Sequence, residues 1–332
     1  MALASVSFIL GAVISLSTSW LLVTRLERVG ERLGISEALL GVVAALAADA
    51  PEITSSISAL SEHQFGIGVG VVVGSNVFNV AALLGLGAVV ATKIHLHRRV
   101  VVLAGGVALW IAGVTVVTTS GGATPLEGLV LVAVVLAGYI TVLGLSPRRR
   151  GRLPLPSAWR GWLALAIDEE ESELFEAIRP SRGRPLDAGV AVGALIVVVL
   201  ASVAMERGAS TLGHHFHVAD AVIGGIVLAA VTSLPNAVAG VYLASKGRAS
   251  AALSTALNSN NLNVAAGLLI PGVALGLARA SAVGTLTATS YLLLTLLVVV
   301  GAYVSRGLGR RVGWLIIGLY AFFVVLVVVA TS

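Results

Sequence analysis

The stretch AADAPE at residues 47–52, followed by GSNVFN at 74–79, has a diverged copy further along the same chain. The copy reads VTSLPN at 231–236 and NSNNLN at 258–263, and a shift of 184 residues superimposes both parts without a gap. Because the matched positions include proline, serine and asparagine as well as small apolar residues, the similarity indicates an internal repeat.

The composition predicts that most of the chain lies in a lipid bilayer. Hydrophobic residues make up 57% of the 332 residues and charged residues only 11%, with a mean hydropathy of +1.00. Soluble domains carry about 25% charged residues, so this chain could not cover a water-exposed surface of its size. The absence of cysteine excludes disulfides and thiolate metal sites.

Ten apolar segments are long enough to be transmembrane helices, which need about 20 residues each. At the N-terminus, the lack of a basic leader segment favours a retained helix over a cleaved signal peptide. One long polar stretch, 146–186, separates five spans from five. The expected spans are 2–24, 35–60, 66–91, 99–119, 125–145, 187–205, 219–244, 249–277, 281–304 and 311–331.

The basic residues predict the orientation of these spans. All but two of the 21 Lys and Arg residues, Arg207 and Arg279, lie in loops that follow odd-numbered spans. Because basic loops stay in the cytoplasm, we expect 146–186 to be cytoplasmic and both termini to be outside, in a plasma-membrane protein. The net charge of +5 is then a topology signal, and nucleic acid is not an expected partner.

The two copies of the repeat are expected to run in opposite directions. One covers the second and third spans, the other covers the seventh and eighth, and an odd number of spans separates them. We therefore predict an all-α membrane protein of ten helices in two inverted five-helix repeats, 1–145 and 187–332, joined by the 146–186 linker. Inverted repeats are typical of secondary transporters, which bind substrate near the membrane midplane.

Two carboxylates, Asp49 and Glu52, lie deep inside the second span. A charged carboxylate at the bilayer centre costs at least about 2.5 kcal/mol, so these residues are candidates for a functional site. Their spacing of three residues puts both on one helix face, where two negative charges require a cation or a proton between them. The structural alternative is a protonated pair, or a pair bonded to nearby hydroxyl groups.

Neutral oxygen ligands are concentrated in the same two copies. All seven asparagines of the chain lie there, and amide oxygens suit hard cations such as Ca²⁺. Hydrogen bonding between helices is the alternative role, which is credible for Asn76, Asn258, Asn260 and Asn261. The two matched prolines each free a backbone carbonyl, which could also coordinate an ion.

These motifs resemble those of the cation/calcium exchanger superfamily, which includes sodium/calcium exchangers. That family carries two inverted repeats with the pattern Gly-Thr-Ser-Leu-Pro-Glu, followed by Gly-Ser-Asn-apolar-Phe-Asn. The four stretches at 47–52, 74–79, 231–236 and 258–263 are similar to this pattern in residues and in spacing. The resemblance implies a ten-helix transporter in which peripheral helices slide against a four-helix core.

The chain departs from the family pattern in the position of its acidic groups. The first family glutamate matches Glu52, its mate in the second copy is replaced by Asn236, and Asp49 stands where serine is usual. The resemblance implies a cation site with oxygen donors from both copies. The expected donors are Asp49, Glu52, Ser75, Asn79, Thr232, Ser233, Asn236, Ser259 and Asn263.

The expected function is secondary active antiport by alternating access, sodium/calcium exchanger-like, with Ca²⁺, Na⁺ or H⁺ as the transported ions. Two carboxylates balance one divalent ion, but their place on a single helix equally suits sodium plus a proton, so sodium/proton exchange stays open. The replaced glutamate also leaves open a transport-inactive sensor or scaffold. No enzyme activity and no resident cofactor are expected, because no Ser/His pair or second aspartate faces the carboxylates.

Overall fold

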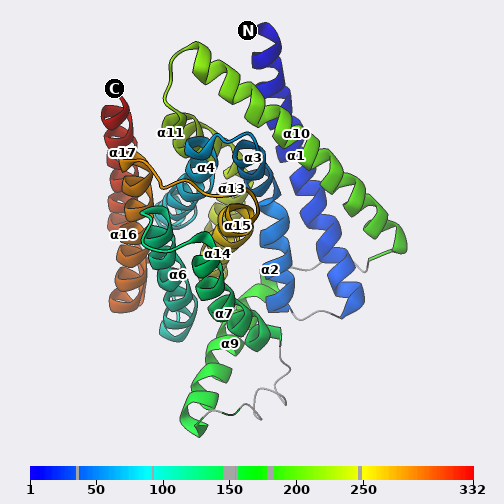
Figure 1. The fold of residues 1–332 in the computed structure, drawn as a ribbon. Helices are drawn as coiled ribbons and strands as arrows, with labels where there is room; N and C mark the ends of the chain where they lie inside the picture. The colour runs from blue at the N-terminus through cyan, green and yellow to red at the C-terminus, as the bar shows by residue number, and fades with distance from the viewer. Residues whose placement is uncertain (35–36, 92, 145–153, 155, 178–182, 246–248) are drawn as a thin grey trace.

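The computed structural model describes the whole chain except residues 35–36, 92, 145–153, 155, 178–182 and 246–248 (Figure 1). Nearly all of the described residues are helical. The first half contains α1 (Ala2–Leu33), α2 (Glu37–Ala48), α3 (Ala50–Ser61), α4 (Phe65–Asn79), the π-helix η1 (Val80–Leu86), α5 (Gly87–Val90), the short strand β1 (Lys93–His95), α6 (Arg98–Thr119) and α7 (Pro125–Gly144). The predicted linker contains α9 (Ser157–Ala177).

The second half repeats much of this order. It contains α10 (Pro185–His215), α11 (Asp220–Val222), the π-helix η2 (Ile223–Leu228), α12 (Ala229–Thr232), α13 (Leu234–Ser245), α14 (Ala249–Leu262), the π-helix η3 (Asn263–Leu269), α15 (Ile270–Leu275), α16 (Ala282–Ser305), the short strand β2 (Gly307–Gly309) and α17 (Arg310–Thr331). The two strands pair antiparallel, with Lys93 opposite Gly309. The termini lie at one end of the molecule and α9 lies at the other (Figure 1).

Seven helical stretches are long and apolar enough to cross a membrane, and an eighth is added if a pair bent by 46°, Asp220–Thr232 and Leu234–Tyr242, counts as one span. The expected spans 35–60 and 249–277 do not meet this test in the described part of the chain. The first is divided between α2 and α3, and the second contains four asparagines that lower its hydropathy. The fold is thus that of a helical membrane protein, with up to eight spans by this measure.

Both bent stretches break just before a proline. Asp49 (φ −80°, ψ −4°) separates α2 from α3, and Ser233 (φ −83°, ψ −1°) separates α12 from α13. Pro51 has no N–H, so the carbonyl of Ala47 loses its helical partner. The hydroxyl of Ser19 on α1 donates to this carbonyl at 3.2 Å. The freed Ala47 carbonyl, considered above as an ion ligand, is therefore occupied by a side chain.

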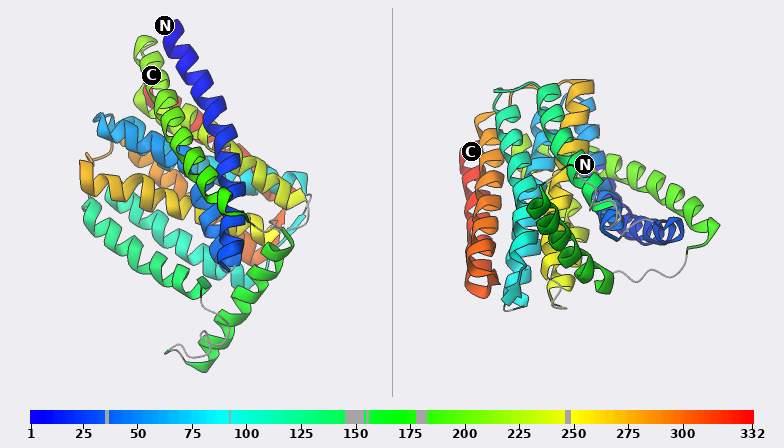
Figure 2. Two further views of the ribbon diagram at one scale, coloured as in Figure 1. Left: turned by 90° about the vertical axis from the view of Figure 1, so that its right-hand side faces the viewer. Right: turned by 90° about the horizontal axis from the view of Figure 1, so that it is seen from below.

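Helices α1 and α10 form a pair that lies beside the main bundle and covers α2 and α3 (Figures 1 and 2). Their backbones touch at two glycines, since a methyl group on Gly11 would lie 2.7 Å from the carbonyl oxygen of Ala201, and one on Gly208 would lie 2.7 Å from that of Ala4. Small residues permit such close approach of membrane helices. The pair therefore packs together as one unit.

The main bundle surrounds α4, which is the most buried of the candidate spans. Valine, leucine and alanine residues of α4, η1, α6, α14 and α16 contribute most of its apolar core. On another side, α4 meets η2 so closely that a methyl group on Gly70 would lie 2.8 Å from the backbone nitrogen of Gly225. This packing leaves the polar residues at the ends of α3, α4, α13 and α14 facing one another.

Candidate cation site

The structure brings all nine sequence-predicted site residues into the interior, and each is at most 2% exposed. They come from the α2–α3 break, α4, the α12–α13 break, α14 and the start of η3. Each copy of the motif is interrupted by a break in its helix, at Asp49 in the first copy and at Ser233 in the second. Side chains from segments 184 residues apart can therefore meet in one place.

Asp49 is held by the second half of the chain. Its Oδ1 accepts hydrogen bonds from Asn236 Nδ2 and from Ser259 Oγ, both at 2.7 Å. Its Oδ2 is buried and has no hydrogen-bond partner among the described residues. One oxygen is therefore used to fix the carboxylate. Asp49 also lies within hydrogen-bonding range of Glu52, so a proton or a cation between the two acids would satisfy the other oxygen.

Glu52 is held in a corresponding way. Its Oε1 accepts a hydrogen bond from Ser233 Oγ, and its Oε2 accepts one from Asn263 Nδ2 at 2.8 Å. A shift of 184 residues converts Asp49 into Ser233 and Asn236 into Glu52. The Asp49–Asn236 bond and the Ser233–Glu52 bond are therefore counterparts, although the carboxylate changes sides.

Two asparagines that we did not include in the predicted site join the two halves behind it. Asn76 Nδ2 donates to the backbone oxygen of Asn260, and Asn260 Nδ2 donates to that of Asn76, both at 3.1 Å. Asn79 Nδ2 also donates to Asn260 Oδ1 at 3.1 Å. The role considered for Asn76 and Asn260 in the sequence, hydrogen bonding between helices, is the one that the structure gives them.

Four buried side-chain oxygens of the predicted site have no hydrogen-bond partner among the described residues. They are Asp49 Oδ2, Ser75 Oγ, Asn79 Oδ1 and Asn263 Oδ1. Buried polar atoms are nearly always paired, so a group of such oxygens indicates a place where something else binds. One carboxylate, one hydroxyl and two amide oxygens are the donors that hard cations prefer.

The remaining predicted donors are used within the protein. Ser233 and Ser259 donate their hydroxyl hydrogens to the two carboxylates. Thr232 Oγ1 donates to the carbonyl of Leu228 on its own helix at 2.9 Å. Ser233 and Ser259 therefore orient the two carboxylates, whereas the Thr232 hydroxyl bonds within its own helix.

The charge of the centre has no basic partner. No ion pair in the described part of the chain includes Asp49 or Glu52, although the two carboxylates lie close enough to interact electrostatically. Among the described residues, no group of three or more His, Asp or Glu side chains is arranged to hold a metal ion. The centre is therefore suited to a cation bound by oxygen, and unlike the nitrogen-rich sites of zinc or copper.

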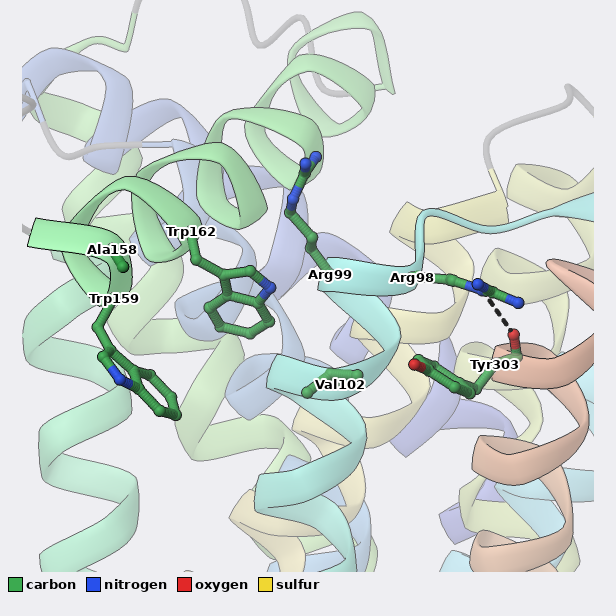
Figure 3. Close-up of a pocket in the computed structure, with 7 residues that line it drawn as sticks. All are labelled: Arg98, Arg99, Val102, Ala158, Trp159, Trp162 and Tyr303. Carbon is green, nitrogen blue, oxygen red and sulfur yellow. Dashed lines mark hydrogen bonds between the residues drawn. The ribbon is translucent and has the colours of Figure 1, made fainter.

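The open hollow of about 470 Å³ at the start of α6 has a different chemistry (Figure 3). Trp159 and Trp162 of α9 point into it, and Arg98 lies over the ring of Tyr303, with its guanidinium carbon 4.9 Å from the ring centre. No acidic side chain lines this hollow. It is therefore not a cation site.

The fold and the buried centre together define a class: multi-pass helical membrane proteins with an oxygen-rich polar interior. The model of the sodium/calcium exchanger protein family matches residues 3–144 and 187–329, and the chain belongs to this family. The family resemblance predicted from the motifs is confirmed. The match also places the polar stretch containing α9 outside the two conserved parts.

Curated relatives match over short regions. The putative antiporter CaxA of Alkalimonas amylolytica is 32% identical over 89 residues, which are 26% of this chain and 28% of that protein. The sodium/calcium exchanger MaX1 of Methanosarcina acetivorans is 34% identical over 95 residues, 27% of each chain. The chain thus matches just over a quarter of the length of these relatives.

Solved structures match over the whole length. The sodium-calcium exchanger NCX_Mj, soaked with Na⁺ and Sr²⁺, has a TM-score of 0.62 at 19% identity and covers 98% of both chains. The H⁺/Ca²⁺ exchanger CAX has a TM-score of 0.71 at 13% identity, covering 99% of this chain and 86% of that one. At these identities the likeness concerns the fold.

Proposed function

We propose that this protein is a secondary active cation antiporter that exchanges Ca²⁺ for Na⁺ or H⁺ at the centre formed by Asp49 and Glu52. The observation that carries the proposal is a set of four buried oxygens without a hydrogen-bond partner, one on Asp49 and three on neutral side chains, together with two carboxylates that have no basic partner among the described residues. A cation bound there satisfies the oxygens and balances the charge together. Relatives and neighbours named as Na⁺/Ca²⁺ and H⁺/Ca²⁺ exchangers support the same conclusion.

The proposed architecture is ten transmembrane helices in two inverted repeats, 1–145 and 187–332. The paired bonds that interchange under the 184-residue shift support this arrangement, as does the reciprocal Asn76–Asn260 contact. The proposed topology has 146–186 in the cytoplasm and both termini outside, at the plasma membrane. The location of the termini and α9 at opposite ends supports it.

The proposed transport cycle is alternating access around this centre near the membrane midplane. Helices α1 and α10 contact each other closely at glycine residues. Toward the centre, α1 donates a hydrogen bond from the Ser19 hydroxyl to the backbone before the α2–α3 break. A unit of this kind can slide along α2 and α3 without breaking its own packing. Such sliding would open the centre to one side of the membrane at a time.

The choice between ions follows from charge and donor number. Calcium takes six to eight oxygens, and the two carboxylates with Ser75, Asn79 and Asn263 approach that number. Two negative charges balance one divalent ion, which favours Ca²⁺ as one transported ion. Sodium/proton exchange is the second candidate, because both carboxylates belong to one side of the centre and a proton on either leaves one charge for Na⁺.

The test is cation flux into proteoliposomes containing the wild type, Asp49→Asn or Glu52→Gln. Asp49→Asn can keep the oxygen that accepts both of its hydrogen bonds, whereas Glu52→Gln loses one of two acceptors. Each substitution removes a charge, so we expect each to abolish exchange. Glu62→Gln is the matched control, because this glutamate follows the same helix, is partly exposed and pairs with Arg207 at 2.7 Å. Wild-type flux in both site variants would remove the assignment.

The ions in the same assay separate the candidates. Sodium-driven or proton-driven uptake of ⁴⁵Ca²⁺ supports calcium exchange, whereas proton-coupled sodium flux that calcium does not inhibit supports sodium/proton exchange. Cation binding without any flux identifies a transport-inactive relative.

A further inference from the structure

A third buried carboxylate, Glu206, lies outside the proposed centre. It belongs to α10, its side chain is fully buried, and it faces α3. Ser58 Oγ of α3 donates to Glu206 Oε2 at 2.7 Å, and Glu206 Oε1 has no hydrogen-bond partner among the described residues. One carboxylate oxygen is therefore fixed and the other is available, as at Asp49.

A line of polar residues on α3 runs from the centre to Glu206. Glu52, Ser55 and Ser58 follow one another at intervals of three residues, which places them next to each other on the helix surface. Ser55 Oγ is also buried without a hydrogen-bond partner. The six residues from Glu52 to Ser58 rise about 9 Å along the helix, so Glu206 lies beyond the centre toward one end of the bundle.

That end of the bundle is closed by polar contacts between α10 and the turn that joins α3 to α4. Arg207 Nε of α10 pairs with Glu62 Oε1 at 2.7 Å, and Ser210 Oγ donates to Gln64 Oε1 at 2.9 Å. Both contacts are more exposed than the Ser58–Glu206 bond. Glu206 thus lies between the buried centre and the polar end of the bundle.

No basic side chain among the described residues forms an ion pair with Glu206. Arg207 is directed to Glu62, and these two residues are the charged groups that act on the Glu206 carboxylate. The α1 helix packs on α10 with Gly11 and Ser15, and its residues 2–24 contain no ionisable side chain. A carboxylate within a span is costly when charged, so it requires one positive charge.

We propose that Glu206, with Ser55 and Ser58, forms a second binding site for a single positive charge, a proton or Na⁺, between the centre and the Glu62 end of the bundle. One carboxylate and two hydroxyls are too few oxygens for Ca²⁺, which excludes the divalent ion from this site. The role of the site as a stage on the ion route rests on the proposed antiport, but the binding itself does not.

Binding is tested on the purified full-length protein with dicyclohexylcarbodiimide, which modifies protonated carboxyl groups in apolar surroundings. The carboxyl proton moves to a carbodiimide nitrogen, and the carboxylate oxygen bonds to the central carbon. The O-acylisourea then rearranges to a stable N-acylurea, which mass spectrometry of peptides assigns to a residue. Glu206→Gln is the negative control, and Glu127→Gln, which changes an exposed carboxylate of α7 bonded to Thr124, should leave labelling of Glu206 unchanged.

We expect labelling of Glu206 to increase as the pH falls. The pH series is repeated with Na⁺ replaced by K⁺ at constant ionic strength. Suppression by Na⁺ but not by K⁺ identifies sodium as the second occupant, and equal labelling in both salts identifies the proton alone. Labelling of Glu206 that responds neither to pH nor to Na⁺ overturns the proposal.

Transport gives an independent measurement. We expect Glu206→Gln to slow exchange at least about tenfold, equivalent to about 1.4 kcal/mol in the barrier, and to flatten its dependence on external pH or Na⁺. Stabilisation by Ca²⁺ at the centre should be unchanged. Exchange with a wild-type rate and wild-type dependence on both ions would overturn the role of Glu206 on the ion route, whereas the labelling experiment decides whether it binds a positive charge. Absence of flux in the wild type refutes the antiporter instead, and the labelling experiment still tests Glu206.

Discussion

Ser75 and Ser259 are equivalent in sequence but not in structure, and this difference gives a quantitative prediction. Ser259 Oγ donates to Asp49 Oδ1 at 2.7 Å, whereas Ser75 Oγ has no partner among the described residues. Replacing each serine with alanine removes the same atom from matching positions of the two copies. The two variants should therefore fail in different ways.

The magnitude for Ser259→Ala follows from the bonds that are lost. Asn236 and Asn79 each retain another acceptor when the Ser259 hydroxyl is removed: Asn236 keeps its 2.7 Å bond to Asp49, and Asn79 keeps its 3.1 Å bond to Asn260. Only the hydrogen bond from Ser259 to the Asp49 carboxylate is therefore lost without replacement. A hydrogen bond to a charged group contributes about 1.5–3 kcal/mol. The cation-free protein should be destabilised by about this amount.

Ser75→Ala removes a buried hydroxyl that has no partner, so the cation-free protein should be unchanged or slightly more stable. If the hydroxyl binds the cation, its loss appears only when the cation is present. A ligand at 100 times its dissociation constant stabilises by about 2.7 kcal/mol, and a tenfold loss of affinity reduces this to about 1.4 kcal/mol.

Both effects are measured by denaturation of the detergent-solubilised protein while Ca²⁺ and Na⁺ are titrated. Ser259→Ala should lower the stability without cation, and Ser75→Ala should lower only the increment produced by the cation. Equal destabilisation of the two cation-free variants, or a full cation response in Ser75→Ala, would refute the assignment of Ser75 as an unpaired ligand.

Three further predictions concern the framework of the site. Gly70→Ala should destabilise the protein by about 1–3 kcal/mol, because the added methyl group would clash with the backbone of Gly225. Gly106→Ala is the control and should have little effect, because the added methyl group would lie in open space. Denaturation curves of the two variants test the difference. Asn260→Ala should cost about 1–3 kcal/mol in the same assay, because it leaves the Asn76 carbonyl without its Asn260 bond. Ser19→Ala should lower the free energy of unfolding by about 1 kcal/mol, because it leaves the Ala47 carbonyl without its hydrogen bond from Ser19. An unchanged stability would contradict this role of Ser19.

Sequence reasoning succeeded where the signal is local. The membrane location follows from composition. The expected spans 35–60 and 219–244 are continuous, whereas the structure interrupts them at Asp49 and Ser233, two residues before a proline. The count of ten spans is less accessible to such reasoning, because the segment 249–277 that carries the site asparagines loses the hydropathy by which a span is recognised. The polar residues of the site therefore lower the hydropathy of the helical segment that carries them, which makes that segment harder to recognise as a span.

The sequence by itself determined that the protein is a helical membrane protein of the exchanger family and that Asp49 and Glu52 are buried together, since composition, periodicity and motif spacing are properties of neighbouring residues. Only the tertiary structure decided which oxygens are used and which remain free. Asp49 meets Ser259 across 210 positions, and Glu206 meets Ser58 across 148. Such pairings depend on how distant helices pack, which no local pattern records.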